Sequence, residues 1–425
     1  MALSYLDNAH VHQIGHYRTK KFGDGRLLVN DYGFWVFLTN SEYELLRKNR
    51  LHEDSGLLSL LENNGFILDR TNVDNFIHKC RTRMMNSFNG TNIHSIIVND
   101  EESKEPITED TTKKITDFVF QSPSQEINIE FVGNDPLLSF NTIKSIVELA
   151  NRYSKYGSKR ITYSLRSNFH DFKDDHLDFF IINKINLWAN LYPGKNLYNN
   201  QMDLELIKKI NRVYSINGIG IIGRKSLSKD LLDFCINAKI NNLFLKKSSE
   251  CSYAEFFDFW KSFVEDRVES STHSDLKELL TCSMLDRTLN LKPHYYFSAP
   301  PFFNPIGRIV YNYDGKIYPE EDSVGMEIFE FGDVSQSYRE FLRNEQVINF
   351  ARASLNENMV ADVNAYSPYY SPSCVKSYIE TGNVIERFPN ERWAFHNKAY
   401  DYLFDKMLFD EKYREVFFKW AQHRH

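Results

Sequence analysis

The sequence predicts an α/β protein whose central unit is an open, partial parallel (β/α)6 barrel. Two features of residues 91–250 predict this: short β-branched apolar runs alternate with longer segments of 3.6-residue periodicity, and the connections between them are short. A third is segment 127–140, I-N-I-E-F-V-G-N-D-P-L-L-S-F, where an alternating apolar run stops at Gly133 and Pro136 before a helical pattern begins after Ser139. This segment is one complete strand-to-helix step.

The predicted barrel contains six strands separated by five helices. Strict alternation of strand and helix is typical of a parallel sheet, because every parallel connection needs a crossover. The elements, starting and ending with a strand, are expected at 93–98, 108–120, 127–132, 139–153, 160–165, 173–182, 185–189, 203–214, 218–222, 228–238 and 242–245. Sites in such barrels lie at the carboxyl ends of the strands, so we expect one in the loops after Val98, Val132, Leu165 and Ala189.

Residues 1–90 are predicted to form a winged-helix-like unit. Runs 26–30 and 34–38 flank an Asp-Tyr-Gly turn, and Ser41 is expected to cap a short helix ahead of a second helical pattern. An open sheet edge in such a unit can accept a peptide as an added strand. A packing role without a ligand stays open. DNA binding is disfavoured, because the first helix carries as many acidic as basic residues.

The remainder is predicted as a helical connector at 251–290 and a third unit at 291–425. The aromatic loop 293–305, P-H-Y-Y-F-S-A-P-P-F-F-N-P, is expected to plug a core, with a partner anchor as the alternative. A hairpin at 307–319 turns on an Asp-Gly pair.

Composition narrows the function classes. A net charge of −6 argues against a protein built to coat nucleic acid. The sequence has neither an apolar run of about 18–20 residues nor a signal-peptide pattern, so we expect a cytoplasmic protein without a membrane partner. The spacing of the five cysteines is too wide for a zinc knuckle, a redox pair or an iron-sulfur loop; they are Cys80, Cys235, Cys251, Cys282 and Cys374.

Two segments carry a resemblance to a known family. The Gly-Asn-Asp-Pro at 133–136 resembles the Gly-Gly-Glu-Pro of radical S-adenosylmethionine (radical SAM) enzymes, which meets the amino group of the cofactor. With its flanks, and with the Tyr-Asn-Tyr-Asp-Gly hairpin at 311–315, the chain resembles the maturases of the His-Xaa-Ser peptide-modification system. The resemblance spans roughly 20–410. It implies a radical SAM barrel, an N-terminal peptide-recognition unit and a C-terminal auxiliary (SPASM-like) domain.

The resemblance also shows where cluster ligands are missing. The loop at 99–106, N-D-E-E-S-K-E-P, lacks the three cysteines that hold the catalytic iron-sulfur cluster in the family. In the auxiliary domain, Tyr370, Ser373 and Ala394 stand where the family has cysteines. Carboxylates cannot replace thiolates around such a cluster, so the domain is expected to be degenerate and the chain to hold no cofactor.

The resemblance implies a set of vestigial cofactor-binding residues, and residual S-adenosylmethionine binding stays open. The residues of this set are Gly133, Asn134, Asp135, Pro136, Arg166 and Asn168. No catalytic or metal-binding residue is predicted, since the acidic run 100–102 is best explained as a solvated loop.

The interpretation is a non-catalytic pseudoenzyme that binds a peptide or protein encoded nearby. The setting would be a bacterial multi-gene system, either peptide maturation or anti-phage defence. The alternative is an enzyme that binds a nucleotide or S-adenosylmethionine for non-radical chemistry. Asp135, Arg166 and Asn168 would then line the site, with Asp100 and Glu101 as the acid and base.

Overall fold

In this computed structural model of the 425-residue chain, most residues between 11 and 421 are described. The described ranges are 11–69, 74, 77, 90–99, 105–133, 136–191, 201–222, 229–247, 251–270, 276–290, 306–354, 364–370, 373–386 and 389–421.

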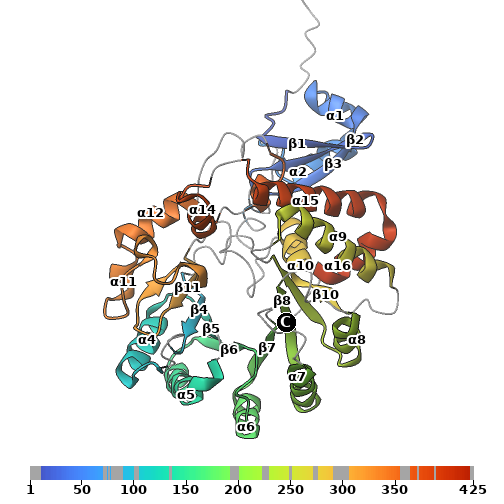
Figure 1. The fold of residues 1–425 in the computed structure, drawn as a ribbon. Helices are drawn as coiled ribbons and strands as arrows, with labels where there is room; N and C mark the ends of the chain where they lie inside the picture. Colours follow the sequence, from blue (N-terminus) through green and yellow to red (C-terminus); the bar gives the residue numbers. More distant parts are fainter. Residues whose placement is uncertain are drawn as a thin grey trace, which may run out of the picture.

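A large, mostly parallel sheet forms the body of the protein (Figure 1). Within the described ranges it has nine strands in the order β10-β9-β8-β7-β6-β5-β4-β11-β12, and only β11 and β12 pair antiparallel. The six predicted strands are all present, and three further strands extend the sheet. The bounds are β4 Ile93–Ile97, β5 Glu126–Val132, β6 Arg160–Ser167, β7 Ile185–Leu191, β8 Ile216–Ile222, β9 Asn242–Lys246, β10 Lys277–Glu278, β11 Arg308–Tyr311 and β12 Ile317–Tyr318.

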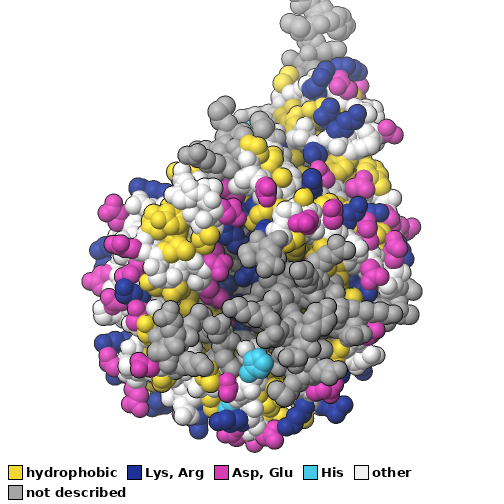
Figure 2. Space-filling model, viewed as in Figure 1, with side chains coloured by type: hydrophobic (Ala, Val, Ile, Leu, Met, Phe, Trp, Pro, Cys, Tyr) yellow, Lys and Arg dark blue, Asp and Glu magenta, His cyan; other side chains and the backbone are white. Residues whose placement is uncertain are grey.

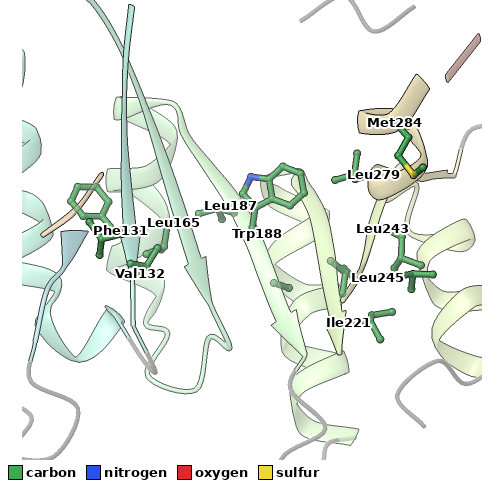
Figure 3. Close-up of a cluster of buried hydrophobic side chains, with 14 of the residues drawn as sticks. Phe131, Val132, Leu165, Leu187, Trp188, Ile221, Leu243, Leu245, Leu279 and Met284 are labelled. Carbon is green, nitrogen blue, oxygen red and sulfur yellow. The ribbon is translucent and has the colours of Figure 1, made fainter. Parts of the chain in front are cut away.

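The five predicted helices connect the strands in sequence and lie along one outer side of the sheet in Figure 1. They are α4 Glu109–Gln121, α5 Phe140–Tyr156, α6 Asp174–Asn183, α7 Gln201–Val213 and α8 Lys229–Asn237. Figure 3 shows buried hydrophobic side chains from β5 to β9, such as Phe131, Leu187 and Leu245, in a cluster with Leu279 and Met284 of α10. This apolar layer fixes the strands in place.

Residues 11–69 form a smaller unit with its own sheet. The strands β1 Tyr17–Phe22, β2 Gly25–Asn30 and β3 Trp35–Thr39 are antiparallel, and α1 Asn40–Arg47, η1 Leu51–Glu53 and α2 Ser55–Asn63 follow. The expected hairpin is β2–β3, whereas β1 was not predicted. The residue that caps α1 is Thr39, not Ser41: the Thr39 hydroxyl accepts the Glu42 N–H, and the Glu42 carboxylate accepts the Thr39 N–H.

The two faces of this small sheet pack differently. Leu28, Val36 and Leu38 face α1 and α2 in a separate core. The opposite face belongs to the main core, where Trp35 meets Phe404 of α15 edge-on with ring centroids 5.3 Å apart. Trp35 Nε1 also donates to the carbonyl of Thr288 at 3.0 Å. The N-terminal unit is therefore fixed to α15 and to the segment around Thr288.

The C-terminal half wraps back onto the sheet. The predicted connector contains α9 Tyr253–Glu269, α10 Leu279–Leu285 and the π-helix η5 Asp286–Asn290. Next, β11 pairs in parallel with β4, so the hairpin predicted at 307–319 is continuous with the large sheet. The aromatic loop 293–305 lies outside the described residues. The later elements are η6 Glu321–Ser323, η7 Glu327–Phe329, α11 Tyr338–Phe341, α12 Glu345–Ser354, η8 Ser367–Tyr369, α14 Cys374–Thr381, α15 Glu391–Phe409 and α16 Glu411–Ala421.

Among the helices that the structure describes, none combines the length and the apolar character that crossing a membrane requires.

Candidate functional site

The face of the large sheet that turns away from the crossover helices carries polar side chains on β4, β5 and β6. Tyr163 of β6 points to the helix side, because its hydroxyl donates to Asn151 Oδ1 of α5 at 2.8 Å. Successive side chains of a strand alternate between faces, so the neighbouring Ser164 and Arg166 lie on the opposite, inner face. Register places Glu130 of β5 beside Ser164, and Ser95 of β4 beside Glu130. Hydroxyl and charged groups from adjacent strands thus meet there.

Five residues on this inner face form what we call the sheet cluster: Ser95, Glu130, Arg166, Arg308 and Glu321. Arg308 of β11 donates to Glu130 Oε2 at 2.8 Å and to Glu321 Oε1 at 2.7 Å. Arg166 of β6 lies 3.0 Å from Glu130 Oε1 through its Nε and also contacts Glu321. The Ser95 hydroxyl donates to Glu130 at 2.8 Å and accepts from Arg308 Nε at 3.1 Å. Two guanidinium groups therefore share two carboxylates.

Members of the sheet cluster differ in exposure. The Glu130 side chain is only 5% exposed, Arg166 and Arg308 are 16% and 19% exposed, and Glu321 is 33% exposed. Burial by itself would raise the pKa of Glu321, but the charges of Arg166 and Arg308 outweigh it and lower the pKa from 4.5 to about 2. Glu321 is therefore ionised at neutral pH, and the cluster is charge-balanced.

A second group, which we call the C-terminal cluster, lies around η8, α14 and α15. Tyr370 donates to Glu386 Oε1 at 2.6 Å, Arg392 Nε donates to the same oxygen at 3.2 Å, and Asn390 Nδ2 donates to it at 2.7 Å. The Ser373 N–H donates to Glu386 Oε2 at 3.1 Å. Glu386 is 1% exposed, so its charge is compensated entirely by protein groups.

Charged side chains of both signs also appear at the surface in the view of Figure 1. Figure 2 shows Lys or Arg beside Asp or Glu below the position of α14. Lys246 of β9 is one of the groups that lower the pKa of Glu321.

No known protein family and no curated protein sequence matches the chain. Solved structures do. "Native anSMEcpe with bound AdoMet" is 13% identical, with a TM-score of 0.62 over 77% of this chain and 99% of that one. "Streptococcus suis SuiB bound to precursor peptide SuiA" is 14% identical, with a TM-score of 0.53 over 88% of this chain and 98% of that one. The chain has a radical-SAM-like fold. At this low sequence identity, the similarity between the structures is a similarity of fold alone.

Within this radical-SAM-like fold, the residues predicted after the second strand are partly described. Gly133 follows β5 and has a φ of +134°, a conformation that favours glycine. An added Cβ there would lie 3.5 Å from Asn99 Oδ1. Pro136 is buried at the start of η2 Pro136–Ser139. Asn134 and Asp135 lie outside the described residues. The structure thus brings Gly133 together with Asn99, which follows β4, at the carboxyl ends of the two strands.

The two residues predicted on the third strand are both engaged within the protein. Arg166 belongs to the sheet cluster. Asn168 follows β6, and its Oδ1 accepts the N–H of His170 at 3.1 Å, which stabilises a local turn. Both polar groups that were expected to face a cofactor make contacts within the protein, and their proposed role in S-adenosylmethionine binding stays a prediction.

The loops that were compared with cluster-binding loops are described only at their edges. Asn99 forms an isolated bridge with Pro106, and residues 100–104, including Asp100 and Glu101, lie outside the described residues. In the C-terminal region, Tyr370 and Ser373 belong to the C-terminal cluster, and Ala394 lies in α15.

Most of the described cysteines are buried. Cys235, Cys282 and Cys374 are buried, Cys251 is half-buried, and Cys80 lies outside the described residues. Burial raises the pKa of the Cys374 thiol, whose Sγ lies 3.5 Å from the Ser354 hydroxyl.

Sequence reasoning missed the carboxylates that organise both clusters: Glu130, Glu321 and Glu386. For Glu130 a signal was present, because the strand I-N-I-E-F-V alternates, and an acid among the alternate positions indicates a polar inner face. Glu321 lies in the short turn η6, and Glu386 lies outside the strands and helices. Neither residue therefore belongs to a periodic sequence pattern that could have indicated it.

Proposed function

We propose that this chain is a non-catalytic, radical-SAM-like protein that binds a peptide or protein partner. The partner would be encoded nearby in a bacterial multi-gene system of peptide-maturation type or of anti-phage defence. No iron-sulfur cluster takes part in this proposal.

The C-terminal cluster is the observation that carries the proposal. Tyr370 and Ser373 stand where the resembling maturases have cluster cysteines, and here both are hydrogen-bonded to Glu386. Burial, together with the neighbouring Glu386 carboxylate, raises the pKa of the Tyr370 hydroxyl, so it stays a neutral donor. A neutral phenol and a serine hydroxyl are poor ligands for iron, whereas the Tyr370 phenol and the Ser373 backbone N–H are well suited to holding a buried carboxylate.

Iron analysis tests the non-catalytic part. We expect protein purified without oxygen from iron-fed cells to be colourless and to contain iron and sulfide far below one equivalent per chain. A brown protein with stoichiometric iron and sulfide would contradict the proposal.

The partner site is proposed at the outer edge of β1. In the described sheet β1 and β3 are the edge strands, and β1 is exposed or half-buried over residues 17–21, including the basic Arg18, Lys20 and Lys21. Figure 2 shows several Lys and Arg side chains on the visible face of this unit. An edge strand offers backbone groups to an incoming peptide strand. Arg18 is paired with Asp31 and Lys20 with Asp401, so the backbone of the edge carries this part of the proposal. In the solved structure, SuiB is bound to its precursor peptide SuiA.

The alternating backbone hydrogen bonds of the small sheet identify which N–H of β1 a mutation should remove. Asn30 N–H bonds to Phe34, so alternate β2 residues bond to β3 and the remaining ones to β1. By the β1–β2 register, the Thr19 N–H then points away from β2, towards the open edge.

Thr19→Pro removes that N–H, and Thr19→Val is the matched control that keeps it. With the tagged protein expressed in its native host, we expect the product of a neighbouring gene to co-purify with the parent and with Thr19→Val, and to be lost with Thr19→Pro. Equal recovery with all three chains would exclude this edge, and no reproducible partner for the parent would exclude the function.

A further inference from the structure

Glu321 is the member of the sheet cluster with the least support from the fold. Ser95, Glu130, Arg166 and Arg308 lie on four neighbouring strands, β4, β5, β6 and β11, which hold their backbones in register. Glu321 instead begins η6, a turn of three residues, and its side chain is the most exposed of the charged members at 33%. Its carboxylate can therefore be displaced without disturbing the sheet.

Displacement of Glu321 would leave a defined anion site. The N–H groups that Arg166 and Arg308 both donate to Glu321 would then be open to another acceptor, while both arginines would keep their contact with Glu130. Lys246 adds positive charge, because it is one of the groups that lower the pKa of Glu321. Guanidinium groups bind carboxylates with good geometry through paired N–H donors. Glu321 Oε1 already receives an N–H from both Arg166 and Arg308, which is the arrangement that a carboxylate ligand would adopt.

We propose that Arg166 and Arg308 form a carboxylate-binding site on the inner face of the sheet, which Glu321 occupies as a built-in ligand. A carboxylate-bearing ligand would enter by replacing Glu321, and Glu130 would stay in place to fix the two arginines. This inference does not depend on the binding of a partner at the edge of β1, nor on the absence of an iron-sulfur cluster.

Glu321→Ala should open the site to added carboxylates. Anything that binds only the folded state raises Tm with its concentration. We expect sodium acetate, compared with sodium chloride at equal ionic strength, to raise the Tm of Glu321→Ala selectively. The parent chain should show only the general stabilisation that acetate gives over chloride, because its own carboxylate fills the position.

Glu330→Ala is the matched control. Glu330 is also an acid with a comparably exposed side chain, 31%, and it accepts from Lys316 Nζ at 2.8 Å. Glu330 contacts a single lysine, whereas Glu321 contacts two arginines. Glu330→Ala should therefore show no larger preference for acetate than the parent chain. An acetate preference of equal size in the parent or in Glu330→Ala would overturn the proposal.

A second variant, Glu321→Ser, guards against a failure to fold. If neither Glu321→Ala nor Glu321→Ser shows the acetate preference, or if neither can be recovered folded even in acetate, the proposal is wrong. N-acetylglutamate amide then distinguishes the ligand source: a larger shift than with acetate assigns the site to an acidic side chain of a polypeptide, and a smaller one assigns it to a small free carboxylate.

Discussion

The sheet cluster and the C-terminal cluster are built from the same groups but differ in access. Each joins arginine to glutamate with hydroxyl support. In the C-terminal cluster, Glu386 is 1% exposed and receives bonds from Tyr370, Arg392, Asn390 and the Ser373 backbone. In the sheet cluster, Glu321 is one-third exposed and lies on a short turn.

This difference teaches that chemistry alone does not define the role of a buried ion pair. A closed cluster contributes only to the fold, because no ligand can reach it. A cluster with one displaceable member can exchange that member for a ligand. Breaking each cluster at an equivalent position should therefore have unequal consequences.

The largest expected effect is at the closed cluster. Glu386→Ala leaves Arg392 buried without its partner, which typically costs about 3–5 kcal/mol of folding free energy. Urea unfolding measures this cost. The control is Glu380→Ala, which removes an exposed acid of α14 and should cost less than about 0.5 kcal/mol. Similar midpoints for the two variants would show that the C-terminal cluster does not stabilise the fold.

Glu130→Gln tests the fixed member of the sheet cluster. Arg166 and Arg308 lose a shared carboxylate but keep Glu321 and some solvent contact, so we expect a smaller loss of about 2–3 kcal/mol in urea unfolding. Glu126→Gln is the control on the same strand, because its ion pair with Arg160 is exposed and should contribute less than about 1 kcal/mol. Equal losses would place Glu130 among ordinary surface acids.

Tyr370→Phe removes one hydroxyl from the closed cluster and keeps the ring. Glu386 loses a donor at 2.6 Å but retains Arg392 and Asn390, so we expect a loss of about 1–2 kcal/mol. Urea unfolding of Tyr378→Phe, a half-buried tyrosine of α14, provides the comparison. A neutral result for Tyr370→Phe would mean that the hydroxyl is not needed to satisfy the carboxylate.

The smallest effect concerns acid sensitivity of the sheet cluster. The pKa of Glu321 is lowered from 4.5 to about 2 in the folded state, so its contribution is present above pH 4.5 and is lost as pH falls towards 2. The Tm advantage of the parent over Glu321→Gln, equivalent to up to about 1 kcal/mol for a part-exposed pair, should shrink across that window.

Comparing the parent with Glu321→Gln cancels the effect of His94, another group whose titration affects stability in acid. Burial lowers the pKa of His94 to about 3, which also weakens the fold in acid, but both chains contain His94 and its contribution cancels. An advantage that stays constant down to pH 2 would contradict the ion pairing of Glu321.

The comparison of prediction with structure separates local from distant effects. The strand and helix of 127–140 were predictable, because alternation and the Gly133 and Pro136 breaks are local signals. β1 was missed, since Y-R-T-K-K-F has no apolar alternation and is held by pairing with β2. The cap at Thr39 was misplaced by two residues, because the nearby Thr39 and Ser41 are both competent caps and only the position of Glu42 selects between them.

The candidate site shows the same limit. The sequence predicted a polar role for Arg166 but not its partners: its contact with Glu321 arises because β11 adds to β4 and brings the following turn over the sheet. That pairing joins segments far apart in the chain and has no local signature.

By itself, the sequence determined the order of strands and helices in the large parallel sheet. Periodicity and breaker residues act over a few neighbouring positions, so they can be read along the chain. Only the tertiary structure decided which charges meet, which of them stay accessible and which edge of the N-terminal sheet is open. Those outcomes depend on long-range packing, because the energy of a charge is set by the groups that surround it in space.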